Sequence, residues 1–443
     1  MFVIGLDIGT TKIAGTLISF PEKKLIKLIS KESNAYISSK YEWERTQDPS
    51  VIVEIVFDII SRLKSYTQEK VSAIGICGQM HGILYVDKKG KALSPLYTWQ
   101  DSRAAKKVGD EELSVIKHLQ NKTGYDVPSG YGIATHYHNL VAGIVPVDLY
   151  KIVSIGSFIS MKLSGSNQVF IDPSEGSSFG FFDPVNFEFD KTAIKKVFES
   201  IDFLPEVVPF YSIAGNDPDN IPVFHSVGDN QASFIGATED QKGRLLVNLG
   251  TSGQISCLSD TIPEDYNKSI EIRPYPGGYL IVGASLSSGT SFTLLAKFFQ
   301  ETMEFFGGDT DIDKIYECLD NLEYVDIKNP VKVEPYFMGT REDPYKRGKI
   351  LNIGLGNLNV YSLLWGFSEA IVLELFNIFK DNNLFDSKND WHLIGSGNGV
   401  RKNPMIKKMI ERIFCMSVTV SEMKEDACYG SALYAWKGIT KET

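Results

Sequence analysis

The chain has 443 residues, of which 43% are hydrophobic and 23% are charged, and its formal net charge is -10. This length favours two domains, because one hydrophobic core rarely organises so long a chain, and the composition excludes a disordered or low-complexity protein. The acidic balance argues against a nucleic-acid surface, so we expect no nucleic-acid partner.

The cysteines and the N-terminus bear on cellular location. Five cysteines are scattered without a Cys-x-x-Cys pair, so we expect buried, reduced thiols. The N-terminus lacks a basic region followed by an apolar core, and we expect no apolar run long enough to span a bilayer. The sequence therefore predicts a cytoplasmic protein that does not bind a membrane.

The first predicted element is a β-hairpin in VIGLDIGTTKIAGTL, residues 3–17. An apolar strand ends at Asp7, a Gly-Thr-Thr-Lys turn follows, and a second apolar strand comes after it. The backbone N–H groups of such a turn, with the side chains of Thr10, Thr11 and Lys12, suit phosphate oxygens. Asp7 is placed to hold a hydrated Mg²⁺, because magnesium takes one or two carboxylates plus phosphate oxygens and water.

A helix and a strand are predicted next. Apolar residues at spacings of three and four predict a helix over residues 50–68, and VSAIGICG, residues 71–78, predicts a buried strand. A helix that leads into a buried strand indicates α/β layering.

Asp229 lies in SVGDNQASFIGA, residues 226–237, after a glycine and before a predicted helix. A carboxylate there can simply cap the helix N-terminus, which is the more frequent use of an aspartate at such a place. A carboxylate at such a place can also take the proton of an acceptor hydroxyl in a phosphoryl-transfer reaction. One residue can serve both roles.

The second half of the chain opens on a stretch that is similar to the first hairpin. LLVNLGTSGQISCL, residues 245–258, again predicts two strands, and Thr251 and Ser252 in its turn supply further donors for phosphate. Each stretch alone could be an ordinary hairpin, since Gly and Thr are common in turns. Two such stretches, one heading each half, predict related domains over 1–240 and 241–443 that face one cleft.

A glycine-rich segment follows a long apolar helix that is predicted near residues 360–380. The segment HLIGSGNGVRKNPM, residues 392–405, predicts a strand, a loop that a nucleoside can approach closely, and a helix that begins at Asn403 and Pro404. Val400 stands where a Gly-x-Gly-x-x-Gly fingerprint would need glycine, and this weakens a nicotinamide-dependent dehydrogenase as an alternative.

Together the motifs resemble those of one family. DIGTTK, GQMHG, TWQDSR, GDNQAS, NLGTSG, GTREDPYKRG and GSGNGVRKNP occur in the order seen in the FGGY carbohydrate kinases, over almost the whole chain. The resemblance implies an α/β chain with a duplicated actin-like (ribonuclease-H-like) ATPase fold, in which ATP and sugar bind in the cleft between two domains. Within the family, the sedoheptulokinases are most similar and the xylulokinases come next.

The resemblance also implies a role for each matching residue. Asp229 would be the catalytic base, and Asp7 the second catalytic residue, which holds Mg²⁺ through water near the γ-phosphate. The implied nucleotide-binding residues are Thr10, Thr11, Lys12, Gly250, Thr251, Ser252, Gly397, Asn398 and Asn403. The implied substrate-binding residues are Gln79, Met80, His81, Trp99, Gln100, Asp101, Arg103 and Asn230. Polar members of the second set suit sugar hydroxyls, and Trp and Met suit the carbon skeleton.

Several structural alternatives stay open. His81 could be a core histidine, Met80 a side chain that fills a gap, and Trp99 a core residue. Residues 339–344 depart from the Gly-Glu-Arg-x-Pro pattern of many family members, so their role near the nucleotide is open.

The resemblance implies an ATP- and Mg²⁺-dependent kinase that phosphorylates a terminal hydroxyl of a ketose, and we expect a homodimer. We favour sedoheptulose, which would give sedoheptulose 7-phosphate, because Gln100 replaces the asparagine of xylulokinases. D-Xylulose, which would give xylulose 5-phosphate, is the alternative substrate. An actin-like ATPase without a sugar substrate is the alternative from another class, but it would have no use for the polar residues of GQMHG and TWQDSR.

Overall fold

The computed structural model describes residues 1–107, 113–250, 252–308, 311–321, 323–339, 345–384 and 390–440. The chain forms two compact units. The first contains Met1–Glu239, Pro274–Pro276 and Glu425–Thr443, and the second contains Asp240–Arg273 and Gly277–Lys424. The C-terminal segment, which we expected in the second domain, is thus part of the first unit.

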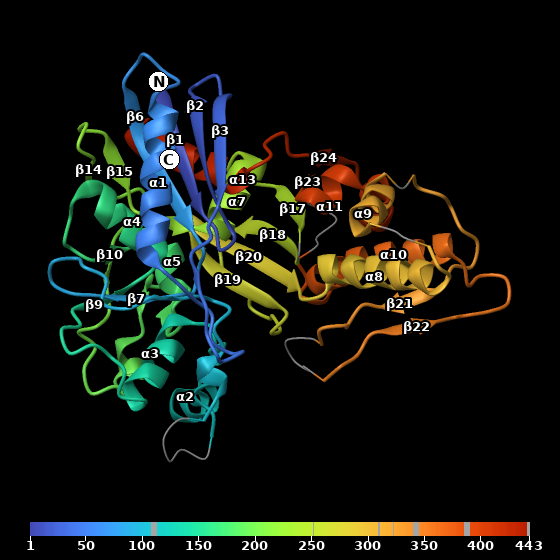
Figure 1. The fold of residues 1–443 in the computed structure, drawn as a ribbon, viewed down its shortest axis with the longest axis horizontal. Coiled ribbons are helices and arrows are strands. Elements are labelled where there is room, and N and C mark those ends of the chain that lie inside the picture. Colours follow the sequence, from blue (N-terminus) through green and yellow to red (C-terminus); the bar gives the residue numbers. More distant parts are fainter. Residues whose placement is uncertain are drawn as a thin grey trace. The chain divides into compact units, whose positions relative to one another are not determined.

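A mixed sheet lies at the centre of the first unit (Figure 1). Its strands, in spatial order, are β14 (Ile213–Asn216), β15 (Pro222–Phe224), β6 (Val71–Gly78), β1 (Phe2–Ile8), β2 (Lys12–Ser19) and β3 (Lys24–Glu32), and β16 (Val227–Gly228) also pairs with β6. The strands β1, β2 and β3 are antiparallel in succession. In contrast, β6 runs parallel to β1, and both β15 and β16 run parallel to β6. The predicted first hairpin and the predicted strand after it are confirmed.

Helices and short strands complete the first unit. The helices are α1 (Pro49–Lys64), the 3-10 helix η1 (Arg103–Ala105), α2 (Val115–Thr123), α3 (Gly132–Val141), α4 (Ile155–Ser164), α5 (Pro173–Ser177), α6 (Lys191–Ile194), α7 (Asp229–Thr238) and α13 (Asp426–Thr440). The short strands are β4 (Tyr36–Ile37), β5 (Thr46–Gln47), β7 (Leu84–Val86), β8 (Leu96–Tyr97), β9 (Lys151–Val153), β10 (Phe170–Ile171), β11 (Phe182–Asp183), β12 (Glu188–Phe189) and β13 (Glu206–Val207).

Helix α1 confirms the helix predicted over residues 50–68 and begins as its sequence dictates. The Asp48 carboxylate accepts a hydrogen bond from the Ser50 backbone N–H at 2.8 Å, and Pro49 takes the first helical position. Its buried face is formed by Ile52, Val56, Ile59, Ile60 and Leu63. This face packs against the sheet, where it meets Gly15 of β2.

Helix α13 covers the opposite face of the same sheet at very short range. A Cβ atom added at Gly75 of β6 would lie 1.9 Å from the Ser431 carbonyl oxygen, and one added at Gly5 of β1 would lie 2.0 Å from the Cys428 carbonyl oxygen. The helix therefore packs directly on the backbone of both strands. It also packs against α7, so the C-terminal segment supports the helix that carries Asp229.

We expect Gly75→Ala to lower the free energy of unfolding by about 1–3 kcal/mol or more, because the added methyl group would meet backbone atoms that cannot turn aside. A calorimetric measurement of the unfolding midpoint tests this prediction. Gly356→Ala is the control, since an added Cβ there meets nothing within 4 Å. Equal midpoints for the two variants would contradict the close packing of α13 on β6.

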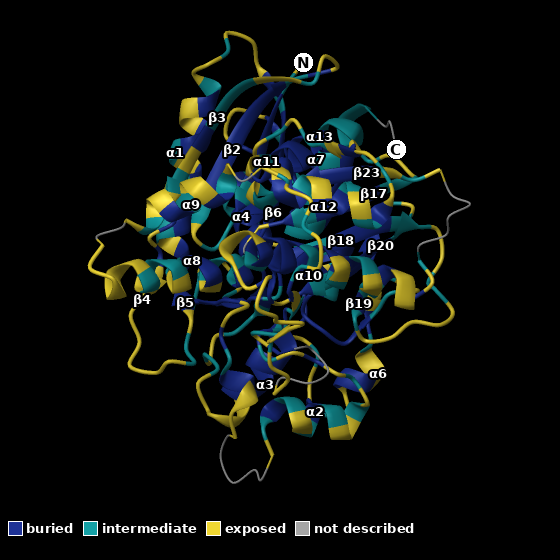
Figure 2. Cartoon of the chain, turned by 90° about the vertical axis from the view of Figure 1, so that its right-hand side faces the viewer, coloured by how far each residue is buried: buried dark blue, intermediate teal, exposed yellow. Residues whose placement is uncertain are grey.

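The sheet of the second unit repeats the plan of the first. Its strands, in spatial order, are β19 (Ile270–Tyr275), β20 (Gly278–Ser285), β18 (Gly253–Ser259), β17 (Arg244–Leu249), β23 (His392–Ser396) and β24 (Val418–Val420). Here β17, β18 and β20 are antiparallel in succession, β23 runs parallel to β17, and β24 runs parallel to β23. The strands β1, β2, β3, β6 and β15 have the same order of directions, so the duplication predicted from the two hairpins is confirmed. The central strands of both sheets are buried (Figure 2).

The remaining elements of the second unit include one long apolar helix. They are α8 (Ser288–Phe305), α9 (Ile312–Asp320), α10 (Val360–Asp381), α11 (Asn398–Lys402), α12 (Pro404–Phe414), β21 (Lys332–Glu334) and β22 (Lys349–Leu351). Helix α10 confirms the helix predicted near residues 360–380. By length and composition it could cross a membrane, so our expectation of no apolar run of that length is wrong. A core helix has the same properties, and 67% of the most apolar part of α10 is buried against its own unit.

The cysteines are all free thiols, but they are not all buried. Cys77, Cys257 and Cys428 lie in the interior, whereas Cys318 and Cys415 are exposed. The expectation of five buried thiols is therefore wrong for two of them.

Candidate active site

The carboxyl ends of three parallel strands meet at one edge of the first sheet. The pairing register places Ile8 of β1 beside Gly78 of β6, and Gly78 beside Gly228 of β16. The loop after β1, the loop after β6 and the start of α7 therefore lie together. Ligand sites of α/β sheets form at such edges, because the loops there can present side chains without interrupting the strands.

Asp7, at the end of β1, lies in a cluster of charges. Burial, followed by the negative charges of Asp229 and Glu425, raises the pKa of Asp7 to about 7, against the opposing effect of Lys12. The Nζ atom of Lys12 lies 2.6 Å from Oε1 of Glu425. The two predicted catalytic carboxylates are thus near enough to repel each other. No sequence pattern could predict the contact of Glu425 with Lys12, because the two residues are 413 positions apart along the chain.

This arrangement fits Mg²⁺ but not a metal held by protein alone. Among the residues that the structure describes, no group of three or more His, Cys, Asp or Glu side chains is arranged to hold a metal ion. Mg²⁺ needs only one or two carboxylates, because phosphate oxygens and water complete its shell. Burial and the neighbouring charges of Asp229 and Glu425 raise the pKa of Asp7, and a cation beside the carboxylate would oppose both effects.

Asp229 occupies the first turn of α7. Gly228 is the N-cap residue, and no side chain caps the helix, so the interpretation of Asp229 as a simple N-cap is wrong. Its carboxylate accepts a hydrogen bond of 3.0 Å from Nδ2 of Asn230. The N-terminal end of a helix favours the ionised form of a carboxylate, which is the form that can accept a proton.

Thr10 joins the first turn to the predicted sugar-binding side. Its hydroxyl donates to Oε1 of Gln79 at 3.1 Å and accepts from Nε1 of Trp99 at 3.0 Å. Gln47 closes the network, because its Nε2 donates to the Thr10 carbonyl at 2.7 Å and its Oε1 accepts from Gln79 at 2.9 Å. The side chain of Trp99 is 48% exposed, so the interpretation of Trp99 as a core residue is wrong. The sequence does not predict a role for Gln47 in this network, because no motif surrounds the residue.

Met80 and His81 follow Gln79 in the loop after β6. Met80 is buried beside Gly228, where an added Cβ would lie 2.9 Å from the Met80 sulfur. His81 is half-buried and has a φ of 73°, a value that is unusual outside glycine. Its ring Nδ1 lies 3.0 Å from the Ser178 carbonyl oxygen and therefore carries the proton, since a carbonyl only accepts. The ring stacks on Tyr131, with 4.2 Å between the ring centroids.

Asp101 and Arg103 form a buried ion pair. Arg103 Nε donates to Asp101 Oδ1 at 2.8 Å, and Nη2 donates to Oδ2 at 3.0 Å, while the exposed fractions of the two residues are 1% and 0%. Arg103 also donates to Asn139 at 2.8 Å and lies over the ring of Tyr97, 4.1 Å from its centroid. These contacts favour a supporting role, in which the pair holds the loop that presents Trp99.

Gln100 is exposed next to this buried pair. Its Oε1 accepts a hydrogen bond of 2.6 Å from the hydroxyl group of Tyr36. The bond directs the amide oxygen of Gln100 toward Tyr36. The amide NH₂ group therefore points away from Tyr36. No sequence motif points to Tyr36.

The second unit brings two of its predicted loops together. The parallel pairing of Asn248 with Ser396 places the turn after β17 beside the glycine loop after β23. Gly397 has a φ of 82°, and a Cβ added there would lie 2.4 Å from the Leu249 carbonyl oxygen. The backbone N–H of Gly250 donates to the Ser252 carbonyl oxygen at 3.0 Å. Thr251, like residues 340–344, lies outside the described residues.

Both polar atoms of the Asn403 side chain make hydrogen bonds that stabilise the fold. Its Oδ1 accepts from the Ile406 backbone N–H at 3.0 Å, which confirms the predicted cap of α12, and its Nδ2 donates to the Leu319 carbonyl at 2.9 Å. The side chain is buried. A direct nucleotide contact of Asn403 is therefore less favoured than a contact of Asn398, which is exposed at the start of α11.

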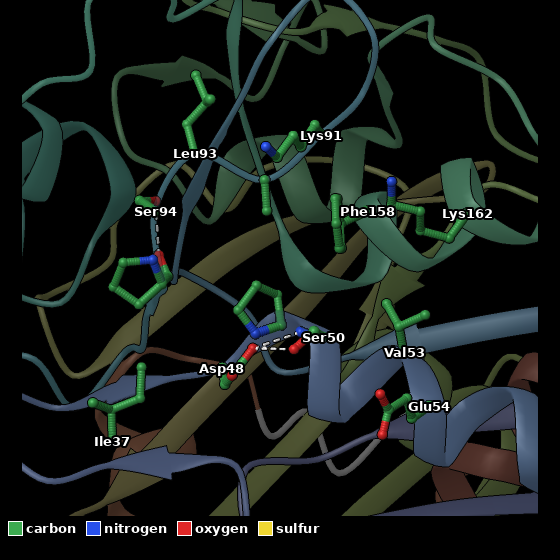
Figure 3. Close-up of a pocket in the computed structure, with 13 residues that line it drawn as sticks. Ile37, Asp48, Ser50, Val53, Glu54, Lys91, Leu93, Ser94, Phe158 and Lys162 are labelled. Carbon is green, nitrogen blue, oxygen red and sulfur yellow. Dashed lines mark hydrogen bonds between the residues drawn. The ribbon is translucent and has the colours of Figure 1, made fainter.

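Each unit also contains a cavity. In the second unit, α9 and α11 line a cavity of about 640 Å³, which contains Asp313, Tyr316, Glu317, Asp320, Asn321, Arg401 and Lys402. In the first unit, a cavity of about 660 Å³ lies between the start of α1 and α4, and its lining includes Asp48, Ser50, Lys91, Phe158 and Lys162 (Figure 3). None of the predicted site residues lines either cavity.

The duplicated sheets, with carboxylates at the strand ends of the first, form the actin-like α/β fold. The chain belongs to the FGGY family of carbohydrate kinases, because the family model for the N-terminal domain matches residues 2–246. The chain is therefore an ATP-dependent sugar kinase, as expected. This assignment removes the dehydrogenase and the ATPase without a sugar substrate as alternatives.

Relatives and solved structures agree with this assignment. The chain is 22% identical to the xylulose kinase of Staphylococcus xylosus, over 99% of this chain and 91% of the relative. It is also 22% identical to the sedoheptulokinase of Mus musculus, over 97% and 96%. The crystal structure of ligand-bound xylulose kinase from Lactobacillus acidophilus aligns with a TM-score of 0.80 at 18% identity, over 99% of this chain and 90% of that one. This last likeness confirms the fold.

Proposed function

We propose that this sugar kinase phosphorylates the terminal hydroxyl of a ketose, with sedoheptulose as the preferred substrate and D-xylulose as the alternative. The two relatives described above are named for different ketoses at the same identity of 22%, so they favour neither. The hydrogen bond between Gln100 and Tyr36 carries the choice.

The catalytic step follows from the edge of the first sheet. Asp229 takes the proton of the sugar hydroxyl while that oxygen forms a bond to the γ-phosphorus, and the bond from phosphorus to the bridging oxygen breaks to release ADP. Mg²⁺, held through water by Asp7, would neutralise charge on the phosphates. Lys12 and the N–H groups of its turn lie beside Asp7 and donate to phosphate oxygens. Glu425 holds Lys12 in place.

The sugar side offers both polar and apolar contacts. Nδ1 of the His81 ring carries a proton, so Nε2 is the ring atom that would accept from a sugar hydroxyl. The exposed ring of Trp99 covers the carbon skeleton. Tyr36 fixes the oxygen of Gln100, so the amide NH₂ group is directed toward the substrate, one methylene group further out than an asparagine would place it. This position suits the additional hydroxyls of a seven-carbon ketose.

The second unit supplies the nucleotide side. The backbone of Gly250 and Gly397 and the side chains of Ser252 and Asn398 suit phosphate and ribose. The cavity between α9 and α11 suits the base, because the ring of Tyr316 offers an apolar face within a polar rim. Asn403 supports this region by capping α12.

The remaining parts of the hypothesis stay predictions. These are Mg²⁺ as the cofactor, a homodimer, a cytoplasmic location, and the absence of nucleic-acid and membrane partners.

A comparison of kcat/KM for sedoheptulose and D-xylulose tests the proposed substrate. We expect wild type to favour sedoheptulose by at least about tenfold, and Gln100→Asn to reduce that ratio by about tenfold, since one misplaced hydrogen bond to substrate costs about 1–2 kcal/mol. Tyr36→Phe should reduce the ratio in the same direction. Gln168→Asn, an exposed glutamine elsewhere in the first unit, is the control. A wild-type preference for D-xylulose of tenfold or more would replace sedoheptulose with the alternative.

A further inference from the structure

One short turn contacts both loops of the proposed active site. Helix α5 and the residue after it, Ser178, lie between the loop that ends at Asp229 and the loop that contains His81. We propose that Ser174 and Ser178 are positioning residues, the first for the catalytic base and the second for the sugar-binding loop. The inference rests on the proposed roles of Asp229 and His81.

The contact with the base passes through the residue before it. The backbone N–H of Gly228 donates to the Ser174 hydroxyl at 2.9 Å. That hydroxyl donates to Oδ1 of Asp172 at 2.5 Å, and Oδ2 of Asp172 accepts from the Tyr434 hydroxyl at 2.8 Å. All of these side chains are buried. The peptide that precedes Asp229 is therefore tied to α13 through two side chains.

Glu175 holds the other end of the same strand. Its Oε1 accepts from the Ser226 hydroxyl at 2.7 Å, and its Oε2 accepts from Ser157 at 3.1 Å and from Ser154. Strand β16 contains only Val227–Gly228, so its pairing with β6 supplies few backbone hydrogen bonds to fix the start of α7. Hydrogen bonds from α5 to Ser226 and Gly228, at either end of this strand, therefore help to fix where α7 begins and where Asp229 lies.

The contact with the sugar-binding loop is separate. The Ser178 hydroxyl accepts from the His81 backbone N–H at 2.9 Å and donates to the Glu175 carbonyl at 2.6 Å. The Ser178 carbonyl accepts from the His81 ring. A left-handed backbone at His81 costs free energy, so it persists because bonds such as these hold it.

These two contacts predict different kinetic effects. A shift of the base by a fraction of an ångström lowers the rate of the chemical step, whereas a shift of His81 weakens the binding of sugar. We expect Ser174→Ala to lower kcat by about 10- to 100-fold with little change in the KM for ATP. We expect Ser178→Ala to raise the KM for sugar by about tenfold with a smaller effect on kcat.

Three further variants sharpen the test. Ser174→Thr keeps the hydroxyl group and should restore most of the lost kcat. Tyr434→Phe acts from α13 without touching the serine, so it should lower kcat in the same direction by a few fold, even if Ser174→Ala fails to fold. Ser177→Ala is the matched control, because its hydroxyl, in the same helix, donates within the helix to the Ser174 carbonyl. It should leave kcat and both KM values unchanged.

A double variant separates this inference from the proposed function. If Ser174 acts through the base, Ser174→Ala should slow the enzyme no further in an Asp229→Asn background. Fully additive losses, or equal effects of Ser174→Ala and Ser177→Ala, would overturn the positioning role. Wild-type turnover of Asp229→Asn alone would instead overturn the proposed base, whatever the serine variants do.

Discussion

Asp229→Asn is expected to lower kcat by about 10²- to 10⁴-fold while the KM for ATP stays close to that of wild type. Asparagine keeps the shape of the side chain and its place in the first turn of α7, but it cannot accept the proton of the sugar hydroxyl. The base acts only as the hydroxyl attacks phosphorus, so its loss affects the chemical step far more than nucleotide binding. Steady-state kinetics with the preferred ketose and ATP measure both quantities.

Asp219→Asn is the matched control for this variant. Asp219 belongs to the same unit, is exposed, and pairs with Lys64 at 2.5 Å on the surface. Exposed pairs of this kind contribute little to stability, so kcat should not change. If Asp229→Asn and Asp219→Asn were equally active, Asp229 would not be the base.

Asp7→Asn is expected to have two opposite effects, a loss of activity and a gain in stability above pH 7. The variant removes the carboxylate that is proposed to hold hydrated Mg²⁺, so kcat should fall by about 10²-fold or more. Without ligands, the same variant removes a charge that burial and the nearby Asp229 and Glu425 oppose. A residue whose function lowers the stability of the fold behaves in this way.

The direction of the stability effect follows from the pKa of Asp7. That pKa is about 7 in the folded protein and 3.8 in the reference state, so the folded protein binds more protons between these values and wild-type stability falls as pH rises from about 4 to 7. Asparagine does not titrate. At pH 8 we therefore expect the free energy of unfolding of Asp7→Asn to exceed that of wild type by about 1–2 kcal/mol, and the difference to vanish near pH 4.

A ligand experiment on the same variant tests the cofactor without measuring activity. With ADP present, Mg²⁺ should raise the unfolding midpoint of wild type and of Asp219→Asn, because it binds the folded form. The midpoint of Asp7→Asn should respond much less. An equal response of all three proteins to Mg²⁺ would remove Asp7 as the holder of the cation.

Much of the fold could be predicted because it depends on residues that are near in sequence. The two hairpins, the helix α1 with its Asp48 cap, and the cap of α12 at Asn403 all follow from patterns within a few positions. The motifs at the ends of β1, β6 and β16 were also visible, since each one follows its own strand. The likeness of the two hairpins then predicted the duplication, and the two sheets confirm it.

Sequence patterns could not show which side chains those motifs would meet. Lys12 pairs with Glu425 across 413 positions, and Gln79 bonds to Gln47 across 32. Arg103 carries a charge that propensity places on the surface, yet it is 1% exposed because Asp101 neutralises it in the interior. Such contacts depend on where distant segments cross.

The amino-acid sequence by itself therefore determined the strands, the caps, the glycine turns and the family, since each of these is encoded over a short stretch or in the order of short stretches. The tertiary structure decided the rest. It placed α13 in the first unit, against the glycines of β1 and β6, and it set α5 between the loops of Asp229 and His81. The reason is physical: burial, desolvation and hydrogen-bond partners belong to the packed chain, and no local pattern specifies them.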